Sequence, residues 1–144
     1  MYAVQLLAFD RFKSFKHNAK RESDYKAVVL MTQADPYFET WNAPPIFTRL
    51  LRVAPEASEI EGHRRFLAAL ESETLAFNRP VLFIHGDSHY FRIDKPLYDS
   101  KSKRMIEDLT RIESFGSPDV HWIRVTVDLA KPALFSARPE LLSH

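Results

Sequence analysis

Residues 80–95, with the sequence PVLFIHGDSHYFRIDK, decide the fold that this chain can adopt. Val81 to Ile84 form a short apolar run, which is typical of a strand buried on both faces. The run ends at His85 and Gly86, and more polar side chains follow. Such an ending matches the place of functional sites at the carboxyl ends of strands in α/β sheets. If the chain carries chemistry, we expect it at this strand end.

The composition indicates one folded domain over residues 1–144. Of the 144 residues, 45% are hydrophobic and 27% are charged, so the chain can bury a core and does not resemble a disordered segment. A net charge of +1 gives no broad electrostatic basis for binding nucleic acid or a membrane. Because the chain has no cysteine, its metal ligands would be His, Asp and Glu, which suit zinc, iron or manganese. Neither a signal peptide nor a membrane-spanning run is visible, and we expect a cytoplasmic protein.

Apolar patterning predicts an α/β fold with a mixed sheet. Ala27 to Thr32 is a second apolar run and is expected to pair with residues 81–85 as a neighbouring buried strand. Apolar residues at helical spacing predict one helix over Tyr2 to about Lys20 and another over Glu59 to Phe77. Two helix–strand pairs followed by a run of strands are typical of an α/β protein. The later strand candidates are residues 111–115, 121–127 and 134–138.

Two features outside these elements have competing interpretations. Residues 36–57 contain four prolines and several aromatic residues, and they can form a packed loop, a lid or a partner surface. The packed loop is the interpretation we favour. His63 lies on the apolar stripe of the second helix, where a hydrogen-bonded core histidine is a more common outcome than a metal ligand.

The polar groups after the central strand have two interpretations as well. His85, Asp87 and His89 lie within five residues and can converge on one ion. Alternatively, the histidines cap backbone groups in a polar turn, and spacing alone slightly favours this interpretation. A serine nucleophile at Ser88 is disfavoured, since no G-x-S-x-G elbow surrounds it.

The sequence GDSH at 86–89, flanked by YFRIDKPL at 90–97 and by RIESFGSPDVHWIRVTVD at 111–128, resembles the C-terminal part of a calcineurin-like metallophosphoesterase. In that superfamily a strand ends in a glycine–histidine–any–histidine motif whose histidines bind a dinuclear metal centre. The resemblance implies Asp87 and His89 as metal ligands, with Asp87 where the first histidine usually stands. It implies that His85 either supports these ligands or protonates the leaving group, as the catalytic residue. Gln33 stands where the family has another metal-binding histidine.

The implied activity is hydrolysis of a phosphate ester by a metal-activated water, with Mn, Fe or Zn as the cofactor. The family's other metal-binding motifs, which lie earlier in its members, are missing here: no Asp-x-His triplet and no Asn-His pair precede segment 86–89, and the one Gly-Asp pair is Gly86-Asp87 itself. The resemblance therefore implies a partial layered α/β sandwich, the C-terminal half of a larger metallophosphoesterase-like domain. Such a fragment is expected to bind metal weakly or not at all and to be inactive or weakly active alone.

A non-catalytic protein-interaction domain is the alternative function. The apolar segment 36–57, together with a sheet face that a missing half would cover, would then form the contact surface. Under this interpretation the partner is a second copy of the chain or another protein. Under the first interpretation it is a phosphate-ester substrate.

Overall fold

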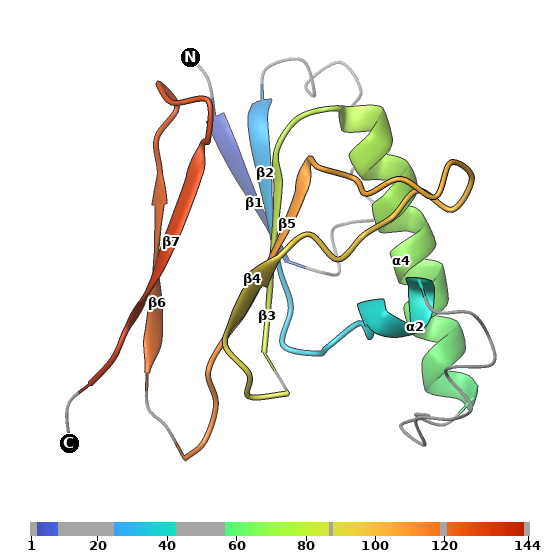
Figure 1. Cartoon of the computed structure of the whole chain (residues 1–144), viewed down its shortest axis with the longest axis horizontal. Coiled ribbons are helices and arrows are strands. Elements are labelled where there is room, and N and C mark those ends of the chain that lie inside the picture. Colours follow the sequence, from blue (N-terminus) through green and yellow to red (C-terminus); the bar gives the residue numbers. More distant parts are fainter. Residues whose placement is uncertain (1–2, 9–24, 43–56, 87, 119–120, 143–144) are drawn as a thin grey trace.

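The computed structural model describes residues 3–8, 25–42, 57–86, 88–118 and 121–142. Within these ranges, a five-stranded mixed sheet lies at the centre (Figure 1). The strands are β1 (Ala3–Ala8), β2 (Tyr25–Met31), β3 (Val81–His85), β4 (Arg92–Asp94) and β5 (Leu109–Glu113). Their order is β1-β2-β3-β5-β4, in which the first four are parallel and β4 runs antiparallel to β5. The chain is thus an α/β protein with a mixed sheet, as predicted.

The predicted pairing of the two apolar runs is confirmed. β2 and β3 are parallel neighbours, with Val28 opposite Val81 and Met31 opposite Ile84. Both strands are covered on each face, which explains why they appear in the sequence as continuous apolar runs. Beyond the strands, the Gly86 N–H donates to the Gln33 carbonyl at 3.2 Å. The loops after β2 and β3 therefore leave the sheet at the same edge.

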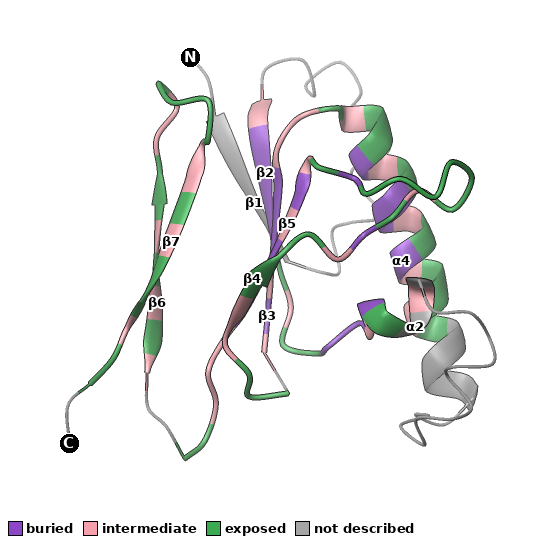
Figure 2. Ribbon diagram, viewed as in Figure 1, coloured by how far each residue is buried: buried purple, intermediate pink, exposed green. Residues whose placement is uncertain are grey.

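Helix α4 (Ala57–Phe77) covers one face of the sheet, and the short helix α2 (Phe38–Asn42) lies beside it (Figure 1). Figure 2 shows the buried residues along the middle strands and along the side of α4 that faces them. Phe38 is only 1% exposed, so the start of segment 36–57 packs as we favoured. Residues 43–56 lie outside the described ranges. The core on this face consists of Val28, Leu30, Phe38, Leu67, Leu70, Val81, Phe83, Leu97, Ile106 and Leu109.

A hairpin covers the opposite face of the sheet. It is formed by β6 (Trp122–Val127) and β7 (Phe135–Glu140), which pair antiparallel (Figure 1). Alternation along the hairpin directs Ile123, Val125, Phe135 and Ala137 onto the buried side chains of Val29, Leu82 and Ile112. The outer side is polar: Arg124 forms an ion pair with Glu140 at 2.8 Å. The sheet is therefore covered on both faces by segments of this chain.

The predicted helix over Tyr2 to about Lys20 is wrong for residues 3–8, which form strand β1. β1 pairs in parallel with β2 from Ala3 to Ala8, and this pairing satisfies backbone groups that a helix would have satisfied locally. A spacing of apolar residues is a weak signal when a neighbouring strand offers a complete ladder of hydrogen bonds. Residues 9–20 of the predicted helix lie outside the described ranges.

His63 is packed as expected but is not fully hydrogen-bonded. Its ring centroid lies 5.2 Å from that of Tyr37, and among the described residues its buried Nδ1 has no hydrogen-bond partner.

None of the described helices has the length and apolar character that crossing a membrane requires.

The hairpin offers a reciprocal pair of substitutions that tests its packing on the sheet. Val125→Thr places a hydroxyl against apolar neighbours and should lower the free energy of unfolding by about 1 kcal/mol. Thr126→Val, on the outer side, should change it by less than about 0.5 kcal/mol. Urea unfolding of both variants measures the difference. Equal effects at the two positions would show that this hairpin does not pack through its inner side.

Candidate metal centre

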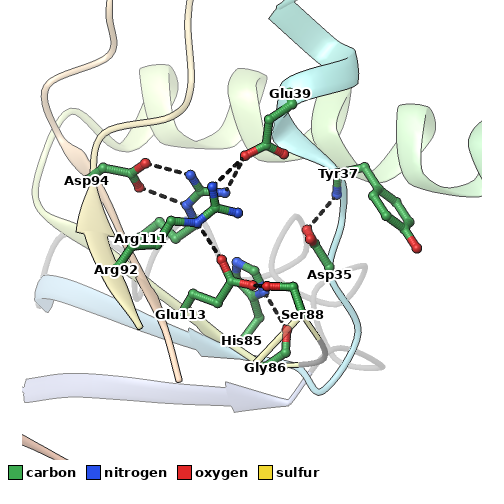
Figure 3. Close-up of polar contacts among 10 residues, drawn as sticks. All are labelled: Asp35, Tyr37, Glu39, His85, Gly86, Ser88, Arg92, Asp94, Arg111 and Glu113. Atoms are coloured by element: carbon green, nitrogen blue, oxygen red, sulfur yellow. Dashed lines mark hydrogen bonds and ion pairs between the residues drawn. The ribbon is translucent and has the colours of Figure 1, made fainter. Parts of the chain in front are cut away.

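Three acidic or imidazole side chains meet at the carboxyl end of the parallel strands. His85 is the last residue of β3, and Glu113, the last residue of β5, is its direct partner in the ladder. Asp35 follows β2 in the loop that leaves the sheet at this edge. One ligand atom of each residue lies within 4.8 Å of those of the other two (Figure 3). All three are buried, with exposed fractions of 7% for Asp35, 1% for His85 and 0% for Glu113.

The hydrogen bonds of His85 leave one ring nitrogen available. Its Nδ1 lies 3.0 Å from the Gly86 carbonyl oxygen. Because a carbonyl can only accept, the proton of the neutral imidazole belongs on Nδ1, and Nε2 keeps its lone pair. Nε2 is buried and has no hydrogen-bond partner among the described residues. A buried polar atom without a partner is costly, and a metal ion would satisfy it.

Asp35 is held by its backbone surroundings. Its Oδ1 accepts a hydrogen bond from the Tyr37 N–H at 2.8 Å. Burial raises the pKa of Asp35, an effect that the Tyr37 N–H opposes and that the negative charges of Glu39 and Glu113 reinforce. The net direction is upward. An ion that compensates the negative charge would reverse this penalty, because metal binding favours the deprotonated carboxylate.

Glu113 is fixed by two donors. Arg92 donates from Nε to Oε2 of Glu113, and Ser88 donates from its hydroxyl to Oε1 (Figure 3). The Arg92 guanidinium also pairs with Glu39 at 2.9 Å through Nη1. A carboxylate oxygen has two lone pairs, so each oxygen of Glu113 can accept a donor and still bind an ion. Held in this way, Glu113 is pre-oriented for a ligand position.

A second guanidinium, that of Arg111, forms ion pairs next to this arrangement. Arg111 is 2% exposed and binds Asp94 through two hydrogen bonds of 2.7 and 2.5 Å. It also contacts Glu39 at 3.2 Å. Burial acts to raise the pKa of Glu39, but its own backbone N–H and the charges of Arg111 and Arg92 outweigh burial and lower it. The ion pairs therefore join α2, β4 and β5.

The charges of the cluster do not balance. Among the residues drawn in Figure 3, the four carboxylates of Asp35, Glu39, Asp94 and Glu113 outnumber the two guanidiniums of Arg92 and Arg111. With every acid ionised, two negative charges remain in excess within this group of described residues. A divalent cation would neutralise them, and one imidazole nitrogen with two carboxylate oxygens is a donor set that suits Mn, Fe or Zn.

The residues predicted from sequence fall in three different places. His85 belongs to the buried group. His89 does not belong to it: it is exposed, its Nδ1 lies 3.0 Å from the Ser117 carbonyl oxygen, and its ring lies against Gly116. A Cβ at Gly116 would lie 2.1 Å from a ring carbon of His89, so this close approach requires glycine. Asp87 lies outside the described residues, and the Gln33 side chain is exposed.

Sequence reasoning missed Asp35 and Glu113 as site residues. A signal for Asp35 was present, because it follows closely on the end of one apolar strand, just as His85 stands at the end of the other. Glu113 lies in the middle of the predicted strand 111–115, between Ile112 and Ser114, and an acid at such a position indicates either a mispredicted strand or a functional group. Neither signal identifies the partner across the sheet.

The raised pKa of Asp35 predicts a pH-dependent effect of Asp35→Asn on the metal-free chain. The pKa of Asp35 is higher in the folded state than its ordinary value of 3.8. Such an acid contributes its full stability to the fold at pH values below that ordinary pKa. The contribution is lost as pH rises through the raised pKa. Asparagine cannot ionise, and it keeps an oxygen for the Tyr37 N–H. Relative to wild type, the variant should therefore gain stability between about pH 4 and about pH 7.

Urea unfolding with a chelator present measures this gain at both pH values. Glu107→Gln, at an exposed acid, is the matched control and should show no such gain. An Asp35→Asn variant that is less stable than wild type at neutral pH would contradict the charge penalty at this site.

Comparison of the chain with protein-family models, with curated proteins and with solved structures gave no match. The likeness of segment 86–89 to metallophosphoesterases thus rests on the sequence motif alone. The function has to be inferred from the geometry of Asp35, His85 and Glu113.

Proposed function

We propose that this chain binds a divalent transition-metal ion through Asp35, His85 and Glu113 and takes part in hydrolysis of a phosphate ester. One observation carries the proposal: a buried imidazole nitrogen that has no partner among the described residues lies in a group with two buried carboxylates. The group lies at the carboxyl edge of the sheet, beside the segment 86–89 that resembles the metallophosphoesterase motif.

The donor set favours a catalytic ion over a structural one. Structural zinc sites have four protein ligands, whereas catalytic sites keep three and leave a position for water or substrate. Asp35, His85 and Glu113 supply three. When bound, the ion would supply a Lewis acid for phosphate oxygens and lower the pKa of a bound water.

The chain's own residues would orient the ligands and the substrate. Ser88 and Arg92 hold the two oxygens of Glu113. The Arg92 side chain is 36% exposed, and among the described residues its Nη2 carries no hydrogen bond. Arg92 can therefore hold Glu113 with one nitrogen and offer another to a phosphate oxygen, because a guanidinium carries donors on all three nitrogens.

In this proposal His85 is a metal ligand and not the acid that protonates the leaving group. Its ring is 1% exposed, and the orientation set by the Gly86 carbonyl points to Nε2 as the ligand atom. The finer proposal for the fold is that the chain corresponds to the C-terminal half of a metallophosphoesterase-like layered sandwich. The layers of α4, sheet and β6–β7 hairpin support the layered arrangement, whereas the sheet face that a missing half was expected to cover is covered by this chain's own hairpin.

Substitution at two alternative ligand sets decides where the metal binds. Titration calorimetry with Mn²⁺ or Zn²⁺ should show one ion bound at about micromolar affinity, since three protein ligands and the excess negative charge of the group favour a cation. Asp35→Asn should weaken binding at least tenfold, by roughly 1.4 kcal/mol. His89→Ala should leave the affinity unchanged, because His89 is exposed and outside the group.

The reverse pattern would assign the ion to the set implied by the motif, Asp87 and His89. Absence of binding in the wild-type chain would overturn the metal proposal and favour the interaction-domain alternative. Circular dichroism of each variant confirms that the fold is kept.

Hydrolysis is tested separately with a generic aryl phosphate. Metal-dependent turnover is expected to be slow, because the described residues provide ligands for one ion and the two-ion mechanism of the family needs a second. The rate should fall to background with Asp35→Asn and with a chelator. A chain that binds the ion tightly but neither hydrolyses the ester nor binds inorganic phosphate would have a structural metal site.

A further inference from the structure

A cavity of about 520 Å³ lies apart from the residues of the metal centre. Its volume falls within the range of small-molecule pockets, roughly 300 to 1,000 Å³. It is bordered by the end of α2, by α4 and by the turn 98–103. The lining residues are Trp41, Arg64, Tyr98, Asp99, Ser100 and Lys103.

One wall of the cavity is a turn that is rigid by its own hydrogen bonds. The Asp99 N–H donates to the Arg104 carbonyl, and the Lys103 N–H donates to the Asp99 carbonyl, each at 2.9 Å. Ser100 fastens the turn to α4, because its N–H and hydroxyl donate to Glu71 Oε1 at 2.9 and 2.7 Å. A wall fixed in this way loses little conformational entropy when a ligand binds.

The charge of Asp99 is used within the turn. Its carboxylate accepts hydrogen bonds from the Ser102 hydroxyl at 2.6 Å and from the Lys101 N–H at 2.8 Å. These hydrogen bonds, that from Ser102 most strongly and that from Lys101 next, lower the pKa of Asp99. The carboxylate therefore stays ionised, and both of its oxygens accept hydrogen bonds within the turn. It is therefore a structural group of the wall.

Two cations on the lining lack such partners. Among the described residues, neither the Arg64 guanidinium nor the Lys103 ammonium forms an ion pair or hydrogen bond. Arg64 projects from α4 and Lys103 from the facing turn, so the two charges come from separate elements on one cavity. Unpaired cations that converge on a cavity favour an anionic ligand.

Two aromatic rings complete the lining. Trp41 packs partly against the core, which fixes its ring, and Tyr98 is 41% exposed. Partly exposed rings at a cavity provide flat apolar surface on which bases or phenyl rings stack. The lining therefore combines sites for a flat ring and for an anion.

We propose that this cavity binds a phosphate group attached to an aromatic ring, as in a nucleoside monophosphate or an aryl phosphate. The rings of Trp41 and Tyr98 contact the ligand ring, and Arg64 and Lys103 bind its phosphate. The proposal uses none of Asp35, His85 and Glu113, so it stands or fails independently of the metal centre.

Tryptophan fluorescence tests the proposal directly. The chain has two tryptophans, and Trp122→Phe leaves Trp41 as the reporter. With a chelator present to exclude the metal centre, AMP and phenyl phosphate are titrated against this variant, alongside adenosine and inorganic phosphate. Stacking predicts saturable quenching of Trp41 by AMP, by phenyl phosphate or by both, and much weaker binding of the two ligands that have only a ring or only a phosphate.

A comparison of AMP with phenyl phosphate distinguishes the two kinds of ligand that fit this proposal. Preference for AMP identifies a nucleotide site, and equal binding identifies a site for aryl phosphates in general. Inorganic phosphate that binds as tightly as AMP, or an absence of saturable quenching by both ring phosphates, would overturn the proposal.

Charge variants test the phosphate contacts. Arg64→Gln and Lys103→Gln, both at exposed positions, should each weaken AMP binding about tenfold or more and leave adenosine unaffected. Lys101→Gln is the matched control: it removes an equal charge from the same turn, and its side chain does not line the cavity. An equal loss in the control would show attraction by net charge alone and overturn the assigned contacts. Urea midpoints verify that all variants are folded.

Discussion

Burial of charged groups on β5 is the constraint on which the rest of this structure depends. Arg111 and Glu113 are 2% and 0% exposed and lie on the same face of this inner strand. A charge removed from water without a partner costs several kcal/mol, so each must meet its partners within the fold. Asp94 and Glu39 meet Arg111, and Arg92 meets Glu113. The positions of β4 and α2 therefore have to satisfy these ion pairs in addition to their apolar contacts.

Stability and the proposed function place opposite demands on the sheet edge. The apolar clusters on the two faces bury side chains such as Phe83 and Leu82 almost completely, and they carry the fold. Within the part of the chain that the structure describes, the strand ends instead gather excess negative charge and leave His85 Nε2 without a partner. Local penalties of this kind are expected where a site is built for a ligand. The proposed ion would remove both penalties at once, because it supplies positive charge and accepts the lone pair.

Helix α2 connects the two candidate sites. Within five residues it directs Phe38 into the core, Glu39 onto the two guanidiniums and Trp41 onto the cavity. Phe38 anchors this short helix, and the Arg111 guanidinium lies 5.2 Å above its ring. Since so short a helix has little stability of its own, tertiary contacts must hold it. Substitutions in α2 therefore have to be examined at both sites.

Elements with continuous or periodic burial were determined by the sequence itself. β2, β3 and α4 follow from local patterns, and so does the expectation that chemistry lies at the strand end containing His85. Only the tertiary structure decided which residues join His85. The register that sets Glu113 opposite it pairs β3 with β5, which are neighbours in the sheet although β4 lies between them in the sequence, and Asp35 arrives from the loop after β2. The same kind of long-range pairing made residues 3–8 a strand. No local periodicity encodes these contacts, because parallel strands acquire their neighbours and their register only when distant segments of the chain pack together.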